Sequence, residues 1–339
     1  MAKAIGAFIS GCAGQALTAV EIAFFRETNP WGLILFARNV GSPAQITALT
    51  RSFREVVGRE NAPVLIDQEG GRVQRLGPPN WREYPPGNRL GALYARDPVK
   101  ALRAARLLSR LIAADLHPLG INVDCVPVLD VPQEGADVII GDRAYSNDPE
   151  VVALIARAVM EGMMEGGVLP VIKHIPGHGR AGVDSHLSLP VVDTPVGELE
   201  ATDFLPFAAL ADAPMAMTAH VVYTAIDAAL PATLSPTAIR LIRQRIGFDG
   251  LLMSDDVSMK ALSGSLDDIS RTAIAAGCDI ALHCNGKMDE MQQVARGAGT
   301  LSGLALQRAN HALAKLAIPI NFDEKQALIE LSGLISATV

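Results

Sequence analysis

Leu-Leu-Met-Ser-Asp-Asp, at residues 251–256, is a short apolar run that leads directly into two adjacent carboxylates. Similar apolar runs recur along the chain and often end at polar or charged residues. They are continuous rather than alternating, which is typical of strands buried on both faces of a parallel sheet. The eight runs are Ala4–Ser10, Gly32–Phe36, Pro63–Ile66, Ile121–Leu129, Leu169–Ile172, Met215–Ala219, Leu251–Met253 and Ile280–His283.

Amphipathic helical patterns separate these runs. They cover Ala44–Val57, Pro98–Leu116, Pro149–Glu165, Ser235–Ile246 and Leu266–Ala276. Asp97 and the serine at 235 each stand before a proline, as expected of an N-cap followed by the first helical residue. The repeats predict an α/β fold, a single (β/α)8 TIM barrel over residues 1–339 with a helical tail from about residue 318. The alternative, an open doubly wound sheet, needs a G-x-G-x-x-G turn after the first strand, which Gly11–Gly14 does not supply.

Composition argues against several classes of protein. The chain has 29 Lys and Arg against 36 Asp and Glu, and a net charge of −7 argues against nucleic-acid binding. Hydrophobic residues make up 49% and charged residues 19%, which argues against disorder.

No apolar stretch reaches the roughly 18 residues of a membrane span, so no membrane association is expected. The four cysteines form no C-x-x-C pair, which suits a reducing compartment and predicts a cytoplasmic location. Nothing demands an oligomer, and we expect a monomer.

Ionisable and amide side chains collect at one end of the predicted strands. In a parallel α/β barrel the carboxyl ends of all strands meet at the face where active sites form. A polar group at almost every such end is therefore the pattern of an enzyme rather than of a generic core. These groups are Arg38, Asn39, Asp67, Gln68, Glu69, Asp130, Lys173, His174, His220, Asp255, Asp256, His283 and Asn285.

Segment 173–186 reads Lys-His-Ile-Pro-Gly-His-Gly-Arg-Ala-Gly-Val-Asp-Ser-His and is the richest in chemistry. It holds three of the seven histidines, and its glycines and proline shape a loop. Three interpretations stay open: a zinc site, acid–base or substrate-binding work, and a merely polar loop. Asp184 and His186 stand two residues apart. A carboxylate at that spacing can accept the second imidazole N–H and support the imidazolium.

Two further groups of residues could carry chemistry. Alternation along a strand sends Asp255 and Asp256 to different faces, so one is expected to enter the barrel mouth as a candidate nucleophile. The alternative is that both cap the following turn or helix. In segment 67–75, carboxylates and arginines stand beside a double glycine and can hydrogen-bond to hydroxyl or amide groups of a ligand. Arg143 is a second candidate for such binding. For each arginine a surface ion pair is the alternative.

Together these segments resemble glycoside hydrolase family 3, and within it the bacterial NagZ-type β-N-acetylglucosaminidases. The resemblance covers most of the chain in order, and segment 173–186 is its most specific part. Ile175 stands where the family usually has Phe. The matching segments are 32–39, 67–76, 141–145, 173–190 and 254–259.

The resemblance implies a single barrel domain that removes terminal β-linked N-acetylglucosamine with retention, notably from 1,6-anhydro-muropeptides in peptidoglycan recycling. It implies that Asp255 is the nucleophile and that His186, partnered by Asp184, is the acid/base. The implied sugar-binding residues are Asp67, Arg75, Arg143, Lys173 and His174. No metal or other cofactor is expected, and the partner is a small carbohydrate. Two other functions stay open at this point: a metal-dependent barrel hydrolase and a sugar-binding protein without activity.

Overall fold

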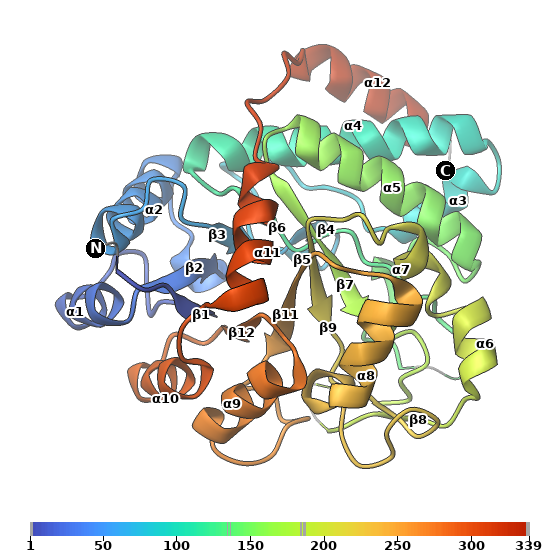
Figure 1. Ribbon diagram of the computed structural model, residues 1–339. Coiled ribbons are helices and arrows are strands. Elements are labelled where there is room, and N and C mark those ends of the chain that lie inside the picture. The colour runs from blue at the N-terminus through green and yellow to red at the C-terminus, as the bar shows by residue number, and fades with distance from the viewer. Residues whose placement is uncertain (1–2, 134, 136, 184, 186–187, 337–339) are drawn as a thin grey trace.

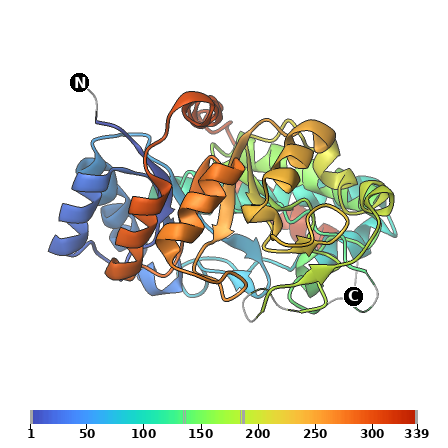
Figure 2. The same ribbon diagram turned by 60° about the horizontal axis from the view of Figure 1, so that its bottom comes forward.

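A computed structural model describes residues 3–133, 135, 137–183, 185 and 188–336. Within these residues, parallel strands close into a barrel in the order β1-β12-β11-β9-β7-β6-β3-β2. Helices surround the barrel in both ribbon views (Figure 1 and Figure 2). The predicted α/β barrel with a single domain is therefore confirmed. The barrel strands are β1 (Gly6–Ser10), β2 (Pro30–Leu35), β3 (Val64–Ile66), β6 (Val123–Asp124), β7 (Leu169–Ile175), β9 (Met215–Thr218), β11 (Leu251–Asp256) and β12 (Ile280–His283).

The barrel strands are short and mostly buried along their whole length, as their continuous apolar pattern predicts. The prediction for β6 was too long, because the apolar run Ile121–Leu129 contains Pro127, which has no N–H for the ladder. Pairing resumes beyond this proline, where the N–H of Leu129 donates to the carbonyl of Lys173 at 2.7 Å. The chain after β6 therefore stays close to the end of β7.

The helices pack on the outside of the barrel. Asp97 and Ser235 accept hydrogen bonds from Lys100 N and Ala238 N, so both are N-caps as predicted. The helix predicted over Ser235–Ile246 is instead α8 followed by a wider π turn at Ile242–Ile246. The helices are α1 (Ala19–Thr28), α2 (Pro43–Val57), α3 (Asn88–Tyr94), α4 (Pro98–Leu116), α5 (Pro149–Glu165), α6 (Val196–Ala201), α7 (Leu205–Ala209), α8 (Pro236–Leu241), α9 (Leu266–Ala276), α10 (Met288–Ala298), α11 (Gly303–Ala314) and α12 (Glu324–Ser336).

Two small sheets shape the loops at the barrel mouth. β4 (Gln68–Gly70) and β5 (Val73–Gln74) form an antiparallel pair directly after β3, and β8 (Val191–Val192) pairs with β10 (Val222–Tyr223). Gly70 has a φ of +97°, and a Cβ there would lie 2.4 Å from the carbonyl oxygen of Pro85. Only glycine fits this position, which lets the β4–β5 pair fold back close to the cavity.

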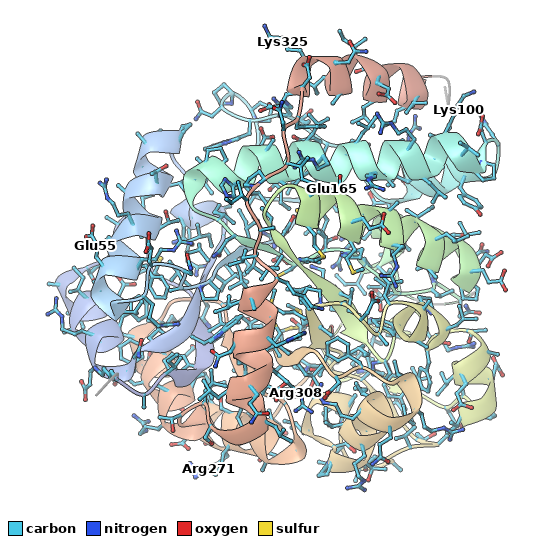
Figure 3. The ribbon with its side chains drawn as sticks, turned by 45° about the horizontal axis from the view of Figure 1, so that its top comes forward. Glu55, Lys100, Glu165, Arg271, Arg308 and Lys325 are labelled. Carbon is cyan, nitrogen blue, oxygen red and sulfur yellow. The ribbon has the colours of Figure 1, made fainter. Side chains whose placement is uncertain are left out.

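The C-terminal helix α12 lies across α4 on the outside of the barrel (Figure 1). Arg103 of α4 donates two hydrogen bonds to Glu330, at 2.7 and 2.9 Å. Arg110 lies over the ring of Phe322 at 4.4 Å. Lys100 and Lys325 point outward in this region (Figure 3). The chain from residue 318 thus follows the barrel as a docked helical tail. No helix in the described ranges is long and apolar enough to cross a membrane.

Candidate active site

A cavity of about 440 Å³ opens at the carboxyl ends of the barrel strands. It collects side chains from β2, β4, β5, β7, β9, β11 and β12, and from the loops that follow the barrel strands. Six of the eight predicted site residues line it, although they are spread from residue 67 to residue 255. They are Asp67, Arg75, Arg143, Lys173, His174 and Asp255. The other two, Asp184 and His186, lie outside the described residues. The lining brings the six together, while their individual roles stay predictions.

Asp67 is bound by two cations at the cavity wall. Its Oδ1 accepts a hydrogen bond from Lys173 Nζ at 2.9 Å, and its Oδ2 accepts one from Arg75 Nη2 at 3.0 Å. Burial alone would raise the pKa of Asp67, but the charges of Lys173 and Arg75 hold it well below its usual range. Arg75 also lies 5.1 Å from the ring centroid of Phe36. These contacts fix all three polar groups before any ligand binds.

Glu69 completes this cluster, and sequence analysis gave it no role of its own. It accepts two hydrogen bonds from Arg143, both at 2.8 Å, in a bidentate pair. Its Oε1 also lies 2.6 Å from Lys173 Nζ. The side chain of Glu69 is only 6% exposed and that of Lys173 only 2%. The sequence held one signal for Glu69. It stands two residues after Asp67, so both carboxylates lie at the end of β3.

Asp255 lies at the partly buried end of β11 and lines the cavity. Its Oδ1 accepts the backbone N–H of Asp256 at 2.7 Å. Burial would raise the pKa of Asp255, but nearby His220 and His174, that N–H and Lys173 lower it below its ordinary value. Within the part of the chain that the structure describes, Asp255 takes part in no ion pair. It is thus an ionised carboxylate to which no cation of the described chain is bound.

Asp256 also lines the cavity, but its carboxylate is engaged by the turn that follows β11. Its Oδ1 accepts hydrogen bonds from the backbone N–H of Ser258 at 3.0 Å and from the Ser258 hydroxyl at 2.9 Å. Its backbone carbonyl lies 3.0 Å from Nε2 of His220. These contacts make Asp256 a capping residue, whereas no side chain among the described residues donates a hydrogen bond to Asp255.

His174 and His178 stand where β7 passes into its loop. Nδ1 of His174 lies 2.7 Å from Oδ2 of the buried Asp130. Nε2 of His178 lies 3.1 Å from the hydroxyl of Ser185, the residue between Asp184 and His186 in the sequence. Burial, followed by the charge of His174, lowers the pKa of His178 to about 4, so this imidazole is neutral near pH 7.

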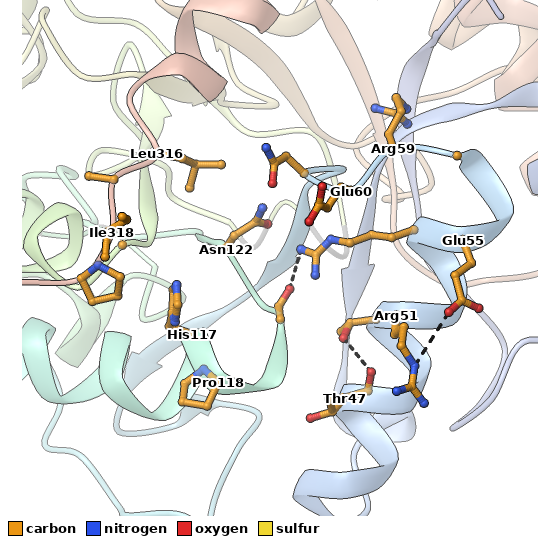
Figure 4. A pocket seen from close by; sticks show the side chains of 18 residues that line it. Thr47, Arg51, Glu55, Arg59, Glu60, His117, Pro118, Asn122, Leu316 and Ile318 are labelled. Carbon is orange, nitrogen blue, oxygen red and sulfur yellow. Dashed lines mark hydrogen bonds and ion pairs between the residues drawn. The ribbon is translucent and has the colours of Figure 1, made fainter.

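A second, larger cavity of about 910 Å³ lies at the opposite end of the barrel (Figure 4). Its lining precedes β3, β6 and β7 rather than following them, and includes Asn122, Gly167 and the segment 316–319. Arg51 and Glu55 at its edge form an exposed pair at 3.9 Å (Figure 4). No predicted site residue lines this cavity. Because barrel enzymes build their sites at the carboxyl ends of the strands, the smaller cavity is the candidate active site.

The mouth cavity is suited to a ligand rich in hydroxyl groups. Carboxylates, guanidinium groups and an ammonium surround it, so acceptors and donors alternate around its wall. Across the described residues, no group of three or more His, Cys, Asp or Glu is placed to hold a metal ion. A free ionised carboxylate beside such a wall can attack an electrophilic carbon or stabilise a cation. The fold and site together define an α/β-barrel enzyme that acts on sugars.

The chain belongs to glycoside hydrolase family 3, since the family's N-terminal domain matches residues 19–317. It is a glycoside hydrolase with β-hexosaminidase activity. A β-hexosaminidase of Xylella fastidiosa is 40% identical over 89% of this chain and 88% of that protein. The crystal structure of NagZ from Neisseria gonorrhoeae in complex with N-trifluoroacetyl-D-glucosamine is 32% identical, covers 98% of both chains and has a TM-score of 0.87. A structure of the same Neisseria protein with a zinc ion is 30% identical, covers 99% of this chain and 96% of that chain, and has a TM-score of 0.83.

Proposed function

We propose that this β-hexosaminidase removes terminal β-linked N-acetylglucosamine by a retaining mechanism with Asp255 as the nucleophile. The observation that carries the proposal is the ionised carboxylate of Asp255 at the mouth cavity, which forms no ion pair with any residue that the structure describes. Binding of N-trifluoroacetyl-D-glucosamine by the Neisseria relative supports an N-acetylated sugar as the ligand. The six cavity residues match the positions at which the family resemblance implies nucleophile and sugar-binding roles.

The reaction proceeds in two balanced steps. A carboxylate oxygen of Asp255 forms a bond to the anomeric carbon while the bond from that carbon to the aglycone oxygen breaks. The imidazolium of His186, supported by Asp184, gives its proton to the departing oxygen. Neutral His186 then takes a proton from water as the water oxygen attacks the anomeric carbon and the bond to Asp255 breaks. Two inversions leave the sugar with its original configuration.

The paired residues of the cavity wall hold the sugar in place for this attack. Asp67 accepts hydrogen bonds from sugar hydroxyl groups, while Arg75 and Lys173 donate to hydroxyl or acetamido oxygens. Arg143 and His174 extend this set on either side. Because Glu69, Asp67 and their cations already bind one another, the wall needs little reorganisation when the ligand arrives.

The substrates we propose are N-acetylglucosaminyl 1,6-anhydro-muropeptides released during peptidoglycan recycling. The four cysteines are free, three of them buried, which supports a reducing compartment such as the cytoplasm. The enzyme is proposed to act as a monomer on this small soluble carbohydrate.

The nucleophile assignment is tested with 4-nitrophenyl N-acetyl-β-glucosaminide. We expect Asp255→Ala to lower kcat by about three orders of magnitude or more, because the covalent step is lost. Proton NMR of the wild-type reaction should show the β-anomer as the first product. Asp289→Asn, on the exposed first turn of α10, is the matched control and should leave kcat unchanged. Unchanged turnover in Asp255→Ala, or the α-anomer as first product, would contradict the proposal.

The acid/base assignment and the metal alternative need separate experiments. His186→Ala should lose about 100-fold or more on phenyl N-acetyl-β-glucosaminide, but much less on the 4-nitrophenyl substrate, whose leaving group needs little protonation. An equal loss on both substrates would contradict acid catalysis by His186. Wild-type turnover should survive dialysis against EDTA. Turnover that disappears with the chelator and returns with Zn²⁺ would instead favour the metal-dependent alternative.

A further inference from the structure

Asp130 lies just outside the wall of the mouth cavity and is fully buried, with 0% of its surface exposed. It follows β6, on the stretch of chain that runs beside the end of β7. Three donors from the end of β7 and its loop surround its carboxylate. Asp130 stands at a strand end in the sequence, but it takes no part in either step of the proposed reaction.

The two carboxylate oxygens of Asp130 hold different parts of the site. Oδ1 accepts the backbone N–H of His174 at 3.2 Å and that of His178 at 2.6 Å. Oδ2 contacts only the His174 ring, at 2.7 Å from Nδ1. Oδ1 therefore fixes the backbone where β7 enters the loop, and Oδ2 fixes the orientation of one imidazole.

This geometry determines which nitrogen of His174 carries a proton. Burial would raise the pKa of Asp130, but His174, His178 and the backbone N–H of His178 lower it to about 2. An ionised carboxylate can only accept, so Nδ1 of His174 must be the donor. His174 lines the cavity, and Nε2 is the nitrogen left to meet a ligand there.

We propose that Asp130 is a positioning residue that fixes the Nδ1–H form and the orientation of the His174 imidazole, so that Nε2 faces a sugar hydroxyl. The proposal rests on the proposed function, because it takes His174 as a sugar-binding residue. For metal-binding imidazoles, loss of the group that holds the second ring nitrogen typically costs about 10- to 100-fold in affinity or activity, and we expect a loss of similar size here.

Asp130→Asn separates the two tasks of this carboxylate. The amide oxygen can still accept both backbone N–H groups, while the amide NH₂ faces Nδ1 of His174 and makes it an acceptor. We expect kcat/KM on the 4-nitrophenyl substrate to fall about 10- to 100-fold with little change in Tm. Nitrogen-15 NMR of the free enzyme should show His174 changing from the Nδ1–H to the Nε2–H form. The His174 signals are identified by their loss in His174→Gln.

A double-mutant cycle shows whether Asp130 acts through His174. In a His174→Ala background, Asp130→Asn should cost little further activity, and independent, multiplying losses would overturn the proposal. Asp279→Asn is the matched control. Asp279 is also buried and bonded to backbone N–H and a cation, but at the amino end of β12, so its loss should lower Tm without changing kcat/KM.

Two further outcomes are distinguishable. If Asp130→Asn does not fold, the wild-type spectrum still decides, because a neutral His174 without a proton on Nδ1 overturns the proposal. If the wild-type enzyme does not release N-acetylglucosamine, the proposed function fails, whereas the tautomer of His174 remains a separate measurement. Normal wild-type turnover together with an unchanged Asp130→Asn variant refutes only the positioning role.

Discussion

Glu69 is an anion held between two cations in a place that water hardly reaches. Its partners are Arg143, with two hydrogen bonds at 2.8 Å, and Lys173 at 2.6 Å. Removing one member of a buried ion cluster leaves an uncompensated charge, which costs about 3–5 kcal/mol. Glu69→Gln keeps the shape but removes the negative charge, so we expect that loss in the free energy of unfolding. We also expect a raised KM, because Arg143 loses its bidentate ion pair, while Lys173 keeps only its bond to Asp67.

Urea unfolding and steady-state kinetics measure both effects. Glu60→Gln is the matched control, because Glu60 is exposed on the loop before β3 and should change neither quantity. A Glu69→Gln protein with wild-type stability would show that the cations find other partners. A lowered stability with unchanged KM would restrict Glu69 to a structural role.

Residue patterns predicted which side chains gather at the mouth, but not how they pair. Asp67, Lys173 and Asp255 could be placed there because strand ends in a parallel barrel converge. The bond between Glu69 and Arg143 joins residues 74 positions apart, and that between Lys173 and Asp67 joins residues 106 apart. A periodic pattern in the sequence cannot predict these pairings, because they depend on how the loops fold after the strands have closed. The predicted acid/base pair, Asp184 and His186, stays a prediction.

At the scale of elements, α4 and α5 approach closely at Gly162. A Cβ on Gly162 would lie 2.2 Å from the Ser109 hydroxyl and 2.5 Å from the carbonyl oxygen of Arg106. Gly162→Ala must therefore push the helices apart, and we expect a loss of about 1–3 kcal/mol in the free energy of unfolding. Gly333→Ala in α12 meets nothing within 4 Å and should instead gain about 0.5–1 kcal/mol.

Thermal unfolding followed by circular dichroism compares the two variants directly. Opposite shifts in Tm are expected, because both replace glycine by alanine in a helix and differ only in the space available. A Gly162→Ala protein as stable as the Gly333→Ala protein would mean that the α4–α5 contact adjusts at no cost. Neither variant should change KM, since neither residue lines the mouth cavity.

Element boundaries were predictable where local chemistry defines them. Asp97 before Pro98 and Asp148 before Pro149 set the starts of α4 and α5, where both helices begin in the structure. The strand β6 was overestimated because an apolar run does not reveal where its ladder partners end. The β4–β5 pair was not predicted, because strands of only two and three residues are too short to show a period in the sequence.

At the scale of the whole molecule, buried carboxylates make the free energy of unfolding depend on pH. Those with lowered pKa values and the one with a raised pKa act in opposite directions. Asp67, Glu69 and Asp130 have lowered pKa values because cations or imidazoles face them, and that of Asp130 is about 2. Such groups stabilise the fold above their unfolded pKa near 4, and this stability is lost as the pH falls through their folded values. Burial raises the pKa of Asp124 to about 8, so its contribution is present below pH 4 and is lost as the pH rises through 8.

These carboxylates predict that the free energy of unfolding rises from pH 2 to about 4. Between about pH 4 and 6.5 the fall from Asp124 is offset by a rise from buried His178, whose pKa is lowered to about 4, so a net decline is expected only from about pH 6.5 to 8. For Asp130 alone the rise is about 2 kcal/mol, because each unit of pKa shift corresponds to about 1.4 kcal/mol. Urea unfolding at pH 3, 6.5 and 8 measures the curve. Asp124→Asn can still accept the N–H of Gln68, bound by Asp124 at 2.9 Å, and should flatten the decline between pH 6.5 and 8. If stability declines as much in Asp124→Asn as in the wild type, other groups cause the decline, because removing the Asp124 carboxylate would have changed nothing.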